Sequence, residues 1–260
     1  MSAAAGGRIV EAAKPRGPEP EERVARPAMY QSWNRLTFLH WRYDPAVIRP
    51  LVPSPLALET FDGDAWIGVT PFLLEGLRAP FVPTLPWLSR SPETNVRTYV
   101  VGPNGLPGIW FFSLDIARFP AFAFARTVYR LPYMWSSLEL RQSATTVRYT
   151  GRRRLPERNA HYDITVEPGQ PFEAPELGSL DHFLTARWRL FVTYGSTVAT
   201  TAVEHPPWPL HRTTVRDIDQ SLLGAAGIPE PGKGMQPLVH FSPGVDTRIG
   251  PPRVVKVGDR

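Results

Sequence analysis

Thirty prolines are spread along this chain of 260 residues, and they constrain its fold more than any other feature. A proline inside a helix removes a backbone hydrogen bond and clashes with the preceding turn, so a bundle of long helices is excluded. Between the prolines lie short runs of aromatic and β-branched residues, the composition typical of strands. These runs cover residues 35–43, 56–74, 95–116, 136–150, 160–168, 187–195, 197–205 and 238–244.

Helical patterns are few and short. They lie at residues 44–52, 120–130, 178–186 and 217–227. Many strands with scattered short helices predict an α+β fold that is mainly β. We expect a curved antiparallel sheet that closes into a barrel or cone, with a few short helices outside it.

The two ends of the chain differ from its middle. Residues 1–28 are rich in Ala, Gly, Pro, Glu and Arg and contain few large apolar side chains. Such a segment cannot bury enough surface to offset the entropy of ordering it, which predicts a disordered tail. Residues 251–260 predict a second loose end. No repeat or linker interrupts residues 29–250, and we expect them to form a single domain.

Composition excludes several classes of protein. The chain has no cysteine, which removes disulfides, thiolate catalysis and Cys-ligated zinc. Its first residues contain no apolar stretch typical of a signal peptide. No run approaches the eighteen apolar residues that a membrane-spanning helix needs. We therefore expect a cytoplasmic protein with no membrane partner.

The formal net charge of +5 is concentrated in one segment. Between Arg141 and Arg158 stand six arginines and one acid, so this segment accounts for the whole excess. A strand pattern followed by Gly and three arginines predicts an exposed turn at Arg152 to Arg154. We interpret these arginines as a solvated hairpin tip, with an anionic partner as the alternative. No similar stripe recurs elsewhere, so nucleic acid is not an expected partner.

Familiar catalytic motifs are absent from the sequence. It contains no nucleophile elbow, phosphate loop, dinucleotide fingerprint or His-Glu-x-x-His motif. The six histidines are scattered, and the closest pair, His205 and His211, has no recognised ligand spacing. We expect neither a metal nor an organic cofactor.

The strand pattern around ETNVRTYV carries the most chemical information. Alternation with a period of two places Glu93, Asn95, Arg97 and Tyr99 on one face. The neighbouring strand pattern, at residues 109–115, has aromatic residues on both faces, which suggests a sheet covered on both sides. The polar face therefore either lines an interior site or forms an outward Arg–Glu pair, and the sequence leaves both alternatives open.

Several motifs resemble known families. Residues 34–58, NRLTFLHWRYDPAVIRPLVPSPLAL, resemble the opening of the acetoacetate decarboxylase superfamily. More closely, ETNVRTYV, WFFSLD, FLTARWRLF, EHPPWPLHRT and HFSPGVDTRIG are similar, in this order, to the YqjF-like family. That family is also called domain of unknown function 2071 and is grouped with the decarboxylases. The closer resemblance covers roughly residues 29–250 and implies the decarboxylase-like barrel.

The resemblance also implies a change in chemistry. In acetoacetate decarboxylases one turn reads aromatic-Pro-Lys-Lys; the first lysine forms a Schiff base, and the second lowers its pKa. Here Leu131 and Pro132 match the turn, but Tyr133 and Met134 stand at the lysine positions. The only three lysines of the chain lie at positions 14, 233 and 256, in the expected tails and a loop. This turn therefore has no amine that could form an iminium ion with a ketone.

Part of the family site remains by resemblance. Arg35 matches the active-site arginine and Glu93 matches one acid, while a second family glutamate falls near Gly68, where this chain has no acid. Tyr133 could bind a ligand or act as an acid, or could fill the volume that a lysine vacates. Glu93 and Tyr133 are the candidate catalytic residues. The candidate ligand-binding residues are Arg35, Glu93, Asn95, Arg97, Arg126, Tyr133 and Met134.

Three functions are compatible with these residues. The first is binding of a small carboxylated or hydrophobic metabolite in a barrel pocket. The second is a lysine-independent enzyme of the lyase, decarboxylase or hydratase kind that uses Arg35 and Glu93. The third is a protein-interaction module built on Trp87 and Trp208. We rank small-molecule binding first, because the resemblance preserves a pocket better than a reaction. The oligomeric state stays open, and a homo-oligomer is compatible with the sequence.

Overall fold

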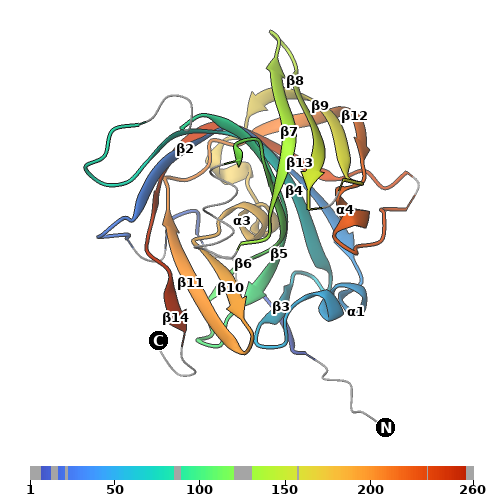
Figure 1. The fold of residues 1–260 in the computed structure, drawn as a ribbon. Helices are drawn as coiled ribbons and strands as arrows, with labels where there is room; N and C mark the ends of the chain where they lie inside the picture. Colours follow the sequence, from blue (N-terminus) through green and yellow to red (C-terminus); the bar gives the residue numbers. More distant parts are fainter. Residues whose placement is uncertain are drawn as a thin grey trace.

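The computed structural model describes residues 7–12, 17–20, 23–84, 89–119, 131–156, 158–232 and 234–255. Strands dominate these residues, and the helices are few and short (Figure 1). The elements are β1 (Ile9–Glu11), β2 (Met29–Tyr43), α1 (Pro45–Ile48), η1 (Arg49–Leu51), β3 (Ala57–Thr60), β4 (Ala65–Arg78), β5 (Ser91–Val101), β6 (Pro107–Ile116), β7 (Tyr133–Gln142), β8 (Val147–Leu155), β9 (His161–Pro171), η3 (Ala174–Glu176), α3 (Ser179–Thr185), β10 (Arg189–Tyr194), β11 (Thr197–Glu204), β12 (His211–Gln220), α4 (Leu222–Ala225), β13 (Leu238–Ile249) and β14 (Arg253–Val255).

One 14-stranded sheet closes on itself twice among the described residues. Pairing of β5 with β6 and of β13 with β11 joins strands that lie far apart in the strand order. One path of paired strands, β6-β5-β4-β2-β13-β11-β10, returns to β6, and we call it the seven-stranded ring. A second path, β6-β5-β4-β2-β13-β12-β9-β8-β7, is the nine-stranded ring. The predicted curved sheet that closes into a barrel is confirmed, although the closure is irregular and most but not all pairs are antiparallel.

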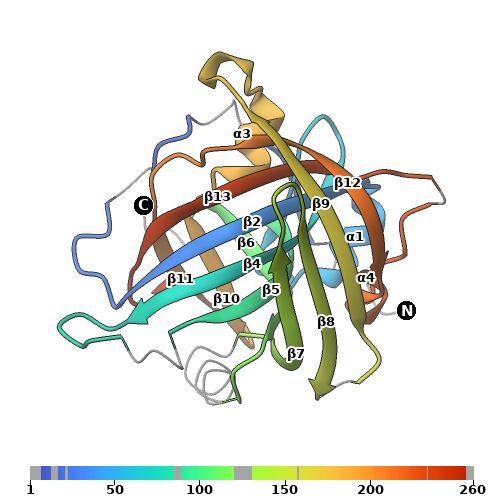
Figure 2. The same ribbon diagram turned by 90° about the horizontal axis from the view of Figure 1, so that it is seen from above.

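Strands β2, β4 and β5 form a wall that both rings share. On one face of the wall, Thr37 contacts Tyr149 of β8 at 2.8 Å and Thr94 contacts Tyr162 of β9 at 2.6 Å, within the main apolar core. On the other face, Tyr99 packs against Phe183 of α3. Figures 1 and 2 show α3 across one end of the seven-stranded ring. The wall is therefore covered on both sides, as the aromatic residues on both faces of 109–115 predicted.

Most sequence patterns form the predicted elements. Asp62 and Gly63, with φ angles of 52° and 78°, form the tight turn between β3 and β4 that the Asp-Gly pair favours. The predicted helices at residues 44–52 and 178–186 correspond to α1 with η1 and to α3. The pattern at 217–227 is helical only from Leu222, because its first residues extend β12. The helix predicted at 120–130 lies outside the described residues.

Parts of the two expected tails pack on the domain. Strand β1 pairs in parallel with β3, with Ile9 opposite Leu58. Val24 is buried, and its backbone N–H donates to Glu204 over 2.6 Å. At the other end, β14 pairs with β11. These segments bury few large side chains, so their composition alone did not predict that they pack on the domain. The domain limits, residues 29–250, stay a prediction.

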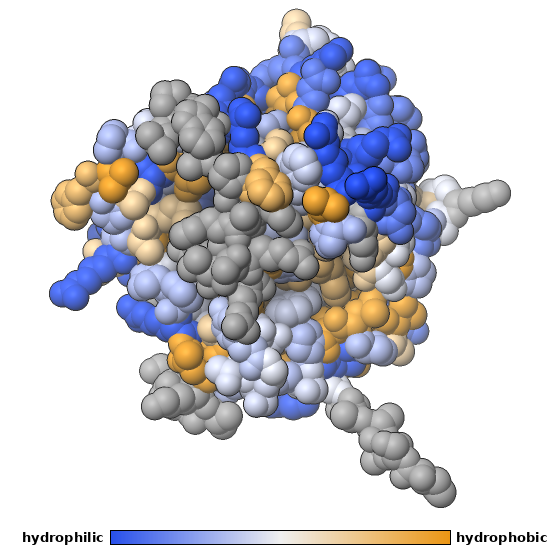
Figure 3. All heavy atoms as spheres, viewed as in Figure 1, coloured by the Kyte–Doolittle hydropathy of each residue, from blue (hydrophilic) through white to orange (hydrophobic). Residues whose placement is uncertain are grey.

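The surface over β8, β9 and β12 is mainly hydrophilic (Figure 3). Outward positions on these strands carry paired charges, such as Arg148 with Asp163 and Arg216 with Glu167. Within the described part of the chain, no helix is long and apolar enough to cross a membrane.

Candidate functional site

Strand β5 directs a row of polar side chains into the seven-stranded ring. Arg97 Nη2 and the Tyr99 hydroxyl both donate to the carbonyl oxygen of Leu184 in α3, over 3.1 and 2.7 Å. Glu93 and Asn95 lie on the same face because side chains alternate along a strand. Glu93, Asn95 and Arg97 are all less than 10% exposed. Of the two alternatives that the sequence left open, the buried one is observed.

Glu93 lies beside Tyr133, whose hydroxyl donates to Glu93 Oε1 over 3.5 Å. Burial raises the pKa of Glu93 to about 8, Asp115 adds to the rise, and the hydrogen bond from Tyr133 opposes it. The carboxyl group therefore carries its proton at neutral pH. A neutral buried acid can donate a hydrogen bond or a proton, which an ionised carboxylate cannot.

Several polar atoms of this row have no partner among the described residues. They are Glu93 Oε2, Asn95 Oδ1 and Arg97 Nε, together with Thr70 Oγ1 on β4, which pairs with β5 at Asn95. A buried polar atom without a partner costs about 1–3 kcal/mol, so proteins rarely leave several together. Such a cluster is typical of a site that a ligand completes.

Arg97 has no acidic partner among the described residues, although it is only 7% exposed. Its guanidinium lies over the ring of Phe38 at 5.1 Å. Two other buried arginines have acidic partners: Arg187 donates to Glu59 over 2.5 Å, and Arg153 is paired with Asp115. Arg49, which is also buried, lies at the outer helix η1 and donates to backbone carbonyl oxygens. Burying a charge is costly unless it is paired, so Arg97 provides an uncompensated positive charge inside the ring.

His40 is a member of this site that sequence reasoning missed. The Tyr99 hydroxyl lies 2.7 Å from His40 Nε2 and donates its own proton to Leu184, so Nε2 carries the hydrogen of a neutral ring. Nδ1 is then a buried acceptor with no described partner. Burial and the nearby Arg97 hold the pKa of His40 well below its usual value. The sequence signal that could have indicated His40 is its place two residues after Phe38 on β2, because both side chains then face the same ring.

Three other predicted site residues are not placed in this row. Arg35 adopts a positive φ of 48°, is partly exposed, and donates to Gln142 over 2.5 Å near Glu75. Met134 follows Tyr133 on β7, and alternation directs it to the opposite face of the strand. Arg126 lies outside the described residues.

The arginine run at 152–154 differs from the prediction. It lies in β8 rather than in a turn, with Arg152 and Arg154 exposed but Arg153 only 3% exposed. Alternation places Arg153 inside the nine-stranded ring, where it pairs with Asp115. The interpretation of all three residues as a solvated tip is therefore wrong for Arg153.

No lysine occurs among the described residues, since positions 14, 233 and 256 all lie outside them. In the same part of the chain, no three His, Asp or Glu side chains lie close enough together to hold a metal ion. The chemistry available in the described row is hydrogen bonding, charge and proton transfer.

The fold is similar to those of solved acetoacetate decarboxylase-like proteins. The acetoacetate decarboxylase of Legionella pneumophila matches 90% of this chain and 90% of its own, with a TM-score of 0.59 and 12% identity. The enduracididine biosynthesis enzyme MppR, solved in complex with pyruvate, matches 92% of this chain and 95% of its own, with a TM-score of 0.57 and 13% identity. At these identities the likeness shows the fold alone.

A family model, domain of unknown function 2071, described as an uncharacterized conserved protein, matches residues 30–246. The uncharacterized protein YqjF of Bacillus subtilis (strain 168) is 36% identical over 225 residues, which make up 86% of this chain and 91% of YqjF. The chain belongs to this family, as the motifs predicted.

Proposed function

We propose that the seven-stranded ring binds a small organic acid, and that Arg97 holds the carboxylate. The observation that carries this proposal is the buried guanidinium of Arg97 without an acid among the described residues. A guanidinium binds a carboxylate through parallel, charge-assisted hydrogen bonds, and its open Nε is one of the donors that this geometry needs. The bound carboxylate would replace the missing counter-charge.

Protonated Glu93 and Asn95 select the rest of the ligand. Glu93 Oε2 and Asn95 Oδ1 are open and lie on the same face of β5 as Arg97. A neutral carboxylic acid donates to a carbonyl or hydroxyl oxygen, so an oxo or hydroxy acid fits the row better than a plain fatty acid. The pyruvate bound by the structural relative MppR is an acid of this kind.

Binding is measured by calorimetry with pyruvate and acetoacetate as probes and with acetone as the uncharged control. Native mass spectrometry of freshly purified protein first reveals any small molecule that co-purifies. We expect the acids to bind and acetone not to bind. Arg97→Met removes a hydrogen bond to a charged group, worth about 1.5–3 kcal/mol, and should weaken binding by roughly tenfold or more.

Arg42→Met is the matched control, because Arg42 is exposed and pairs with Asp64 at 3.7 Å on the surface. Arg97→Lys keeps the charge and guards against a folding defect in Arg97→Met. Equal affinity in the wild type, Arg97→Met and Arg97→Lys would refute the proposal.

A lysine-independent enzyme is the second candidate. It is favoured by the raised pKa of Glu93, about 8, beside the Tyr133 hydroxyl, because an acid that titrates near neutral pH can donate and recover a proton. Glu93→Gln distinguishes the two functions. If the protein is an enzyme, the wild type turns the acid over and the variant loses this turnover while it still binds the acid. If it is a binding protein, neither the wild type nor the variant turns the acid over, and both bind it.

The protein-interaction alternative has little support in the described residues. Trp208 is buried and donates from Nε1 to Thr185 over 3.1 Å, so it presents no docking surface. Trp87 lies outside the described residues. We further propose a cytoplasmic location, a small molecule as the partner in place of nucleic acid or membrane, and an oligomeric state to be measured by light scattering.

A further inference from the structure

A second group of polar side chains lies inside the seven-stranded ring, on β13. His240 pairs with Phe38 of β2 and Ser242 pairs with Leu36, so both side chains face the interior that Phe38 faces. His240 is 1% exposed and Ser242 is fully buried. His240 Nδ1 and Ser242 Oγ have no hydrogen-bond partner among the described residues. Open polar atoms therefore gather on β13 as they do on β5.

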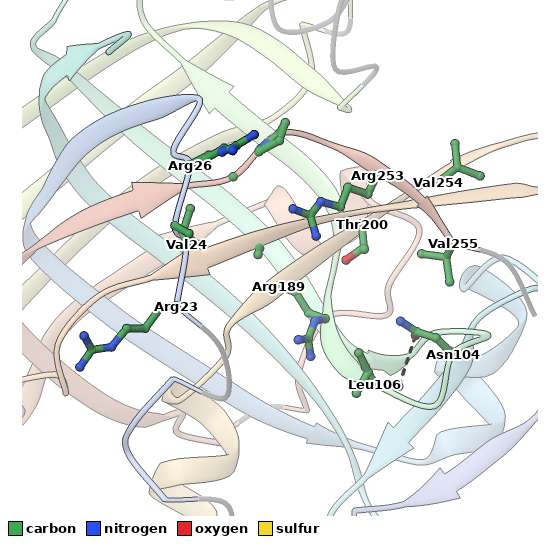
Figure 4. A pocket seen from close by; sticks show the side chains of 14 residues that line it. Arg23, Val24, Arg26, Asn104, Leu106, Arg189, Thr200, Arg253, Val254 and Val255 are labelled. Atoms are coloured by element: carbon green, nitrogen blue, oxygen red, sulfur yellow. Dashed lines mark hydrogen bonds between the residues drawn. The ribbon is translucent and has the colours of Figure 1, made fainter. Parts of the chain in front are cut away.

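The charged groups around the surface hollows are different. One hollow, of about 570 Å³, is lined by Arg23, Arg26 and Arg253, and all three are exposed (Figure 4). Water satisfies exposed guanidinium groups, so they need no ligand. The open atoms on β13 are cut off from solvent, and a buried polar atom without a partner is costly.

Asp181 of α3 determines which nitrogen of His240 carries the hydrogen. His240 Nε2 lies 2.9 Å from Asp181 Oδ1, while Asp181 Oδ2 accepts from the backbone N–H of Gly178 over 2.7 Å. Burial favours the neutral acid, but the hydrogen bonds from His240 and Gly178 hold the pKa of Asp181 below its usual value, so this ionised carboxylate only accepts. Nε2 therefore carries the hydrogen, and Nδ1 of the neutral ring is an acceptor.

His40 provides a second open acceptor beside this one. It pairs with Leu238, two residues before His240, so the two imidazole rings stand diagonally on paired strands. Its Nδ1 also has no described partner. Phe38 connects these atoms to the β5 row, because it stands opposite His240 and its ring lies 5.1 Å from the guanidinium of Arg97. A ligand held by Arg97 thus shares the ring with two imidazole acceptors.

A hydroxyl group satisfies the atoms on β13 better than a carbonyl group does. A hydroxyl both donates and accepts, so it can donate to His240 Nδ1 and accept from Ser242 Oγ. A ketone oxygen only accepts, and it would leave the buried imidazole acceptor without a donor. We infer, resting on the proposed carboxylate site at Arg97, that the ligand is a hydroxy acid. Its hydroxyl group donates to His240, and Asp181 positions the imidazole ring.

The test is calorimetric titration of the full chain with each enantiomer of 3-hydroxybutyrate and with acetoacetate, which carries a keto group in place of the hydroxyl. We expect the wild type to bind one enantiomer at least roughly tenfold more tightly than acetoacetate. His240→Gln keeps a side-chain N–H group for Asp181 but has no acceptor at the Nδ1 position, and it should abolish this preference. His161→Gln is the matched control, because His161 pairs with Asp219 at 3.4 Å on the surface. The control should keep the wild-type preference.

Asp181→Asn tests the positioning role. The Asn carbonyl oxygen would accept from Gly178 N–H, and its NH2 group would then face His240 Nε2, so that the ring hydrogen moves to Nδ1. Nitrogen NMR of labelled histidines measures the tautomer directly. We expect the hydrogen of His240 on Nε2 in the wild type and on Nδ1 in the variant. Because Nδ1 then donates, the variant should bind acetoacetate at least as tightly as 3-hydroxybutyrate.

Three outcomes would overturn the assignment of a hydroxy acid alone. Equal affinity of the wild type for acetoacetate and both enantiomers, weakened in Arg97→Met, would leave the carboxylate site standing without a hydroxyl preference. An unchanged preference in His240→Gln would place the hydroxyl elsewhere. A hydrogen on Nδ1 of His240 in the wild type would remove the acceptor. If the wild type binds none of these acids, the proposed carboxylate site at Arg97 is refuted as well.

Discussion

Arg153 on β8 and Asp115 on β6 form a two-point ion pair inside the nine-stranded ring. The distances from Arg153 Nε to Asp115 Oδ1 and from Nη2 to Oδ2 are both 2.9 Å, and each side chain is 1% exposed. Ser136 donates to Asp115 over 2.6 Å, and Arg153 donates to Ser113 over 2.6 Å. The pair links strands on opposite sides of β7.

Arg153→Met should lower the free energy of unfolding by about 3–5 kcal/mol, because it leaves Asp115 buried and charged without its partner. Arg152→Met, at the exposed neighbouring position, should change it by less than about 0.5 kcal/mol. Urea denaturation measures both. In the double variant Asp115→Asn, Arg153→Met, part of the lost stability should return. Similar effects at positions 152 and 153 would contradict the ion-pair assignment.

Relative to the wild type, Glu93→Gln should have a free energy of unfolding that becomes progressively higher as pH rises from 5 to 9. The pKa of Glu93 is about 8 in the folded protein against 4.5 as a free side chain, so the folded state binds more protons between these values. Wild-type stability therefore falls as pH rises through this window, by up to roughly 5 kcal/mol, while Gln does not titrate. Urea denaturation at both pH values measures the difference between the two proteins.

The histidines change stability with pH in the opposite direction to Glu93. Because the wild type and Glu93→Gln contain the same histidines, their contribution cancels in the difference between the two proteins. Burial lowers the pKa of His205 to about 4, so its contribution is lost as pH falls below 6.5. Glu139→Gln, at an exposed site, is the control and should show no such trend. A constant difference between Glu93→Gln and wild type would mean that Glu93 is ionised in the folded state.

Val24→Ala should lower the free energy of unfolding by about 1–2 kcal/mol, because two methyl-sized groups leave a buried position. Val47→Ala, at a site that is 40% exposed, is the control and should be nearly neutral. Thermal unfolding of both variants measures the difference. Equal stabilities would show that the segment before Ala28 is a detached tail, as its composition suggested.

Borohydride reduction in the presence of acetoacetate should leave no covalent adduct on the protein. By resemblance to the acetoacetate decarboxylases, Tyr133 and Met134 stand where those enzymes have their two lysines, and neither side chain can form an iminium ion. Intact mass spectrometry followed by peptide mapping measures this. A stoichiometric adduct on Lys233 would show that a loop delivers the amine from another part of the chain.

The polar row on β5 was predictable because a period of two is strong in sequence and the neighbouring pattern is aromatic on both faces. Which of its residues lack partners was not predictable. The neighbours of Glu93 and Arg97 come from β7 and α3, about 40 and 87 residues away along the chain. Sequence spacing contains no information about such contacts.

Two errors have a common cause. A run of arginines suggests solvent, yet alternation along β8 directs the middle one inward, and the acid that accepts it lies 38 residues earlier. Similarly, the sequence of strand β12 resembles a loop followed by a helix, because its outward residues are charged. It is a strand because it pairs with β9. In both cases long-range pairing decides the structure, and local propensity does not.

The closure of both rings through β13 has a consequence for biosynthesis. Leu238 of β13 pairs with His40 of β2, and Ile249 pairs with Met29, so almost the whole chain separates the two edges that must meet. A ribosome releases the N-terminal strands first, and pairing between distant strands is intrinsically slow. The wall strands β2, β4 and β5 therefore keep their apolar faces uncovered until translation is nearly complete and β13 can pair. During that interval the nascent chain depends on chaperones or on its own prolines and charges to avoid aggregation.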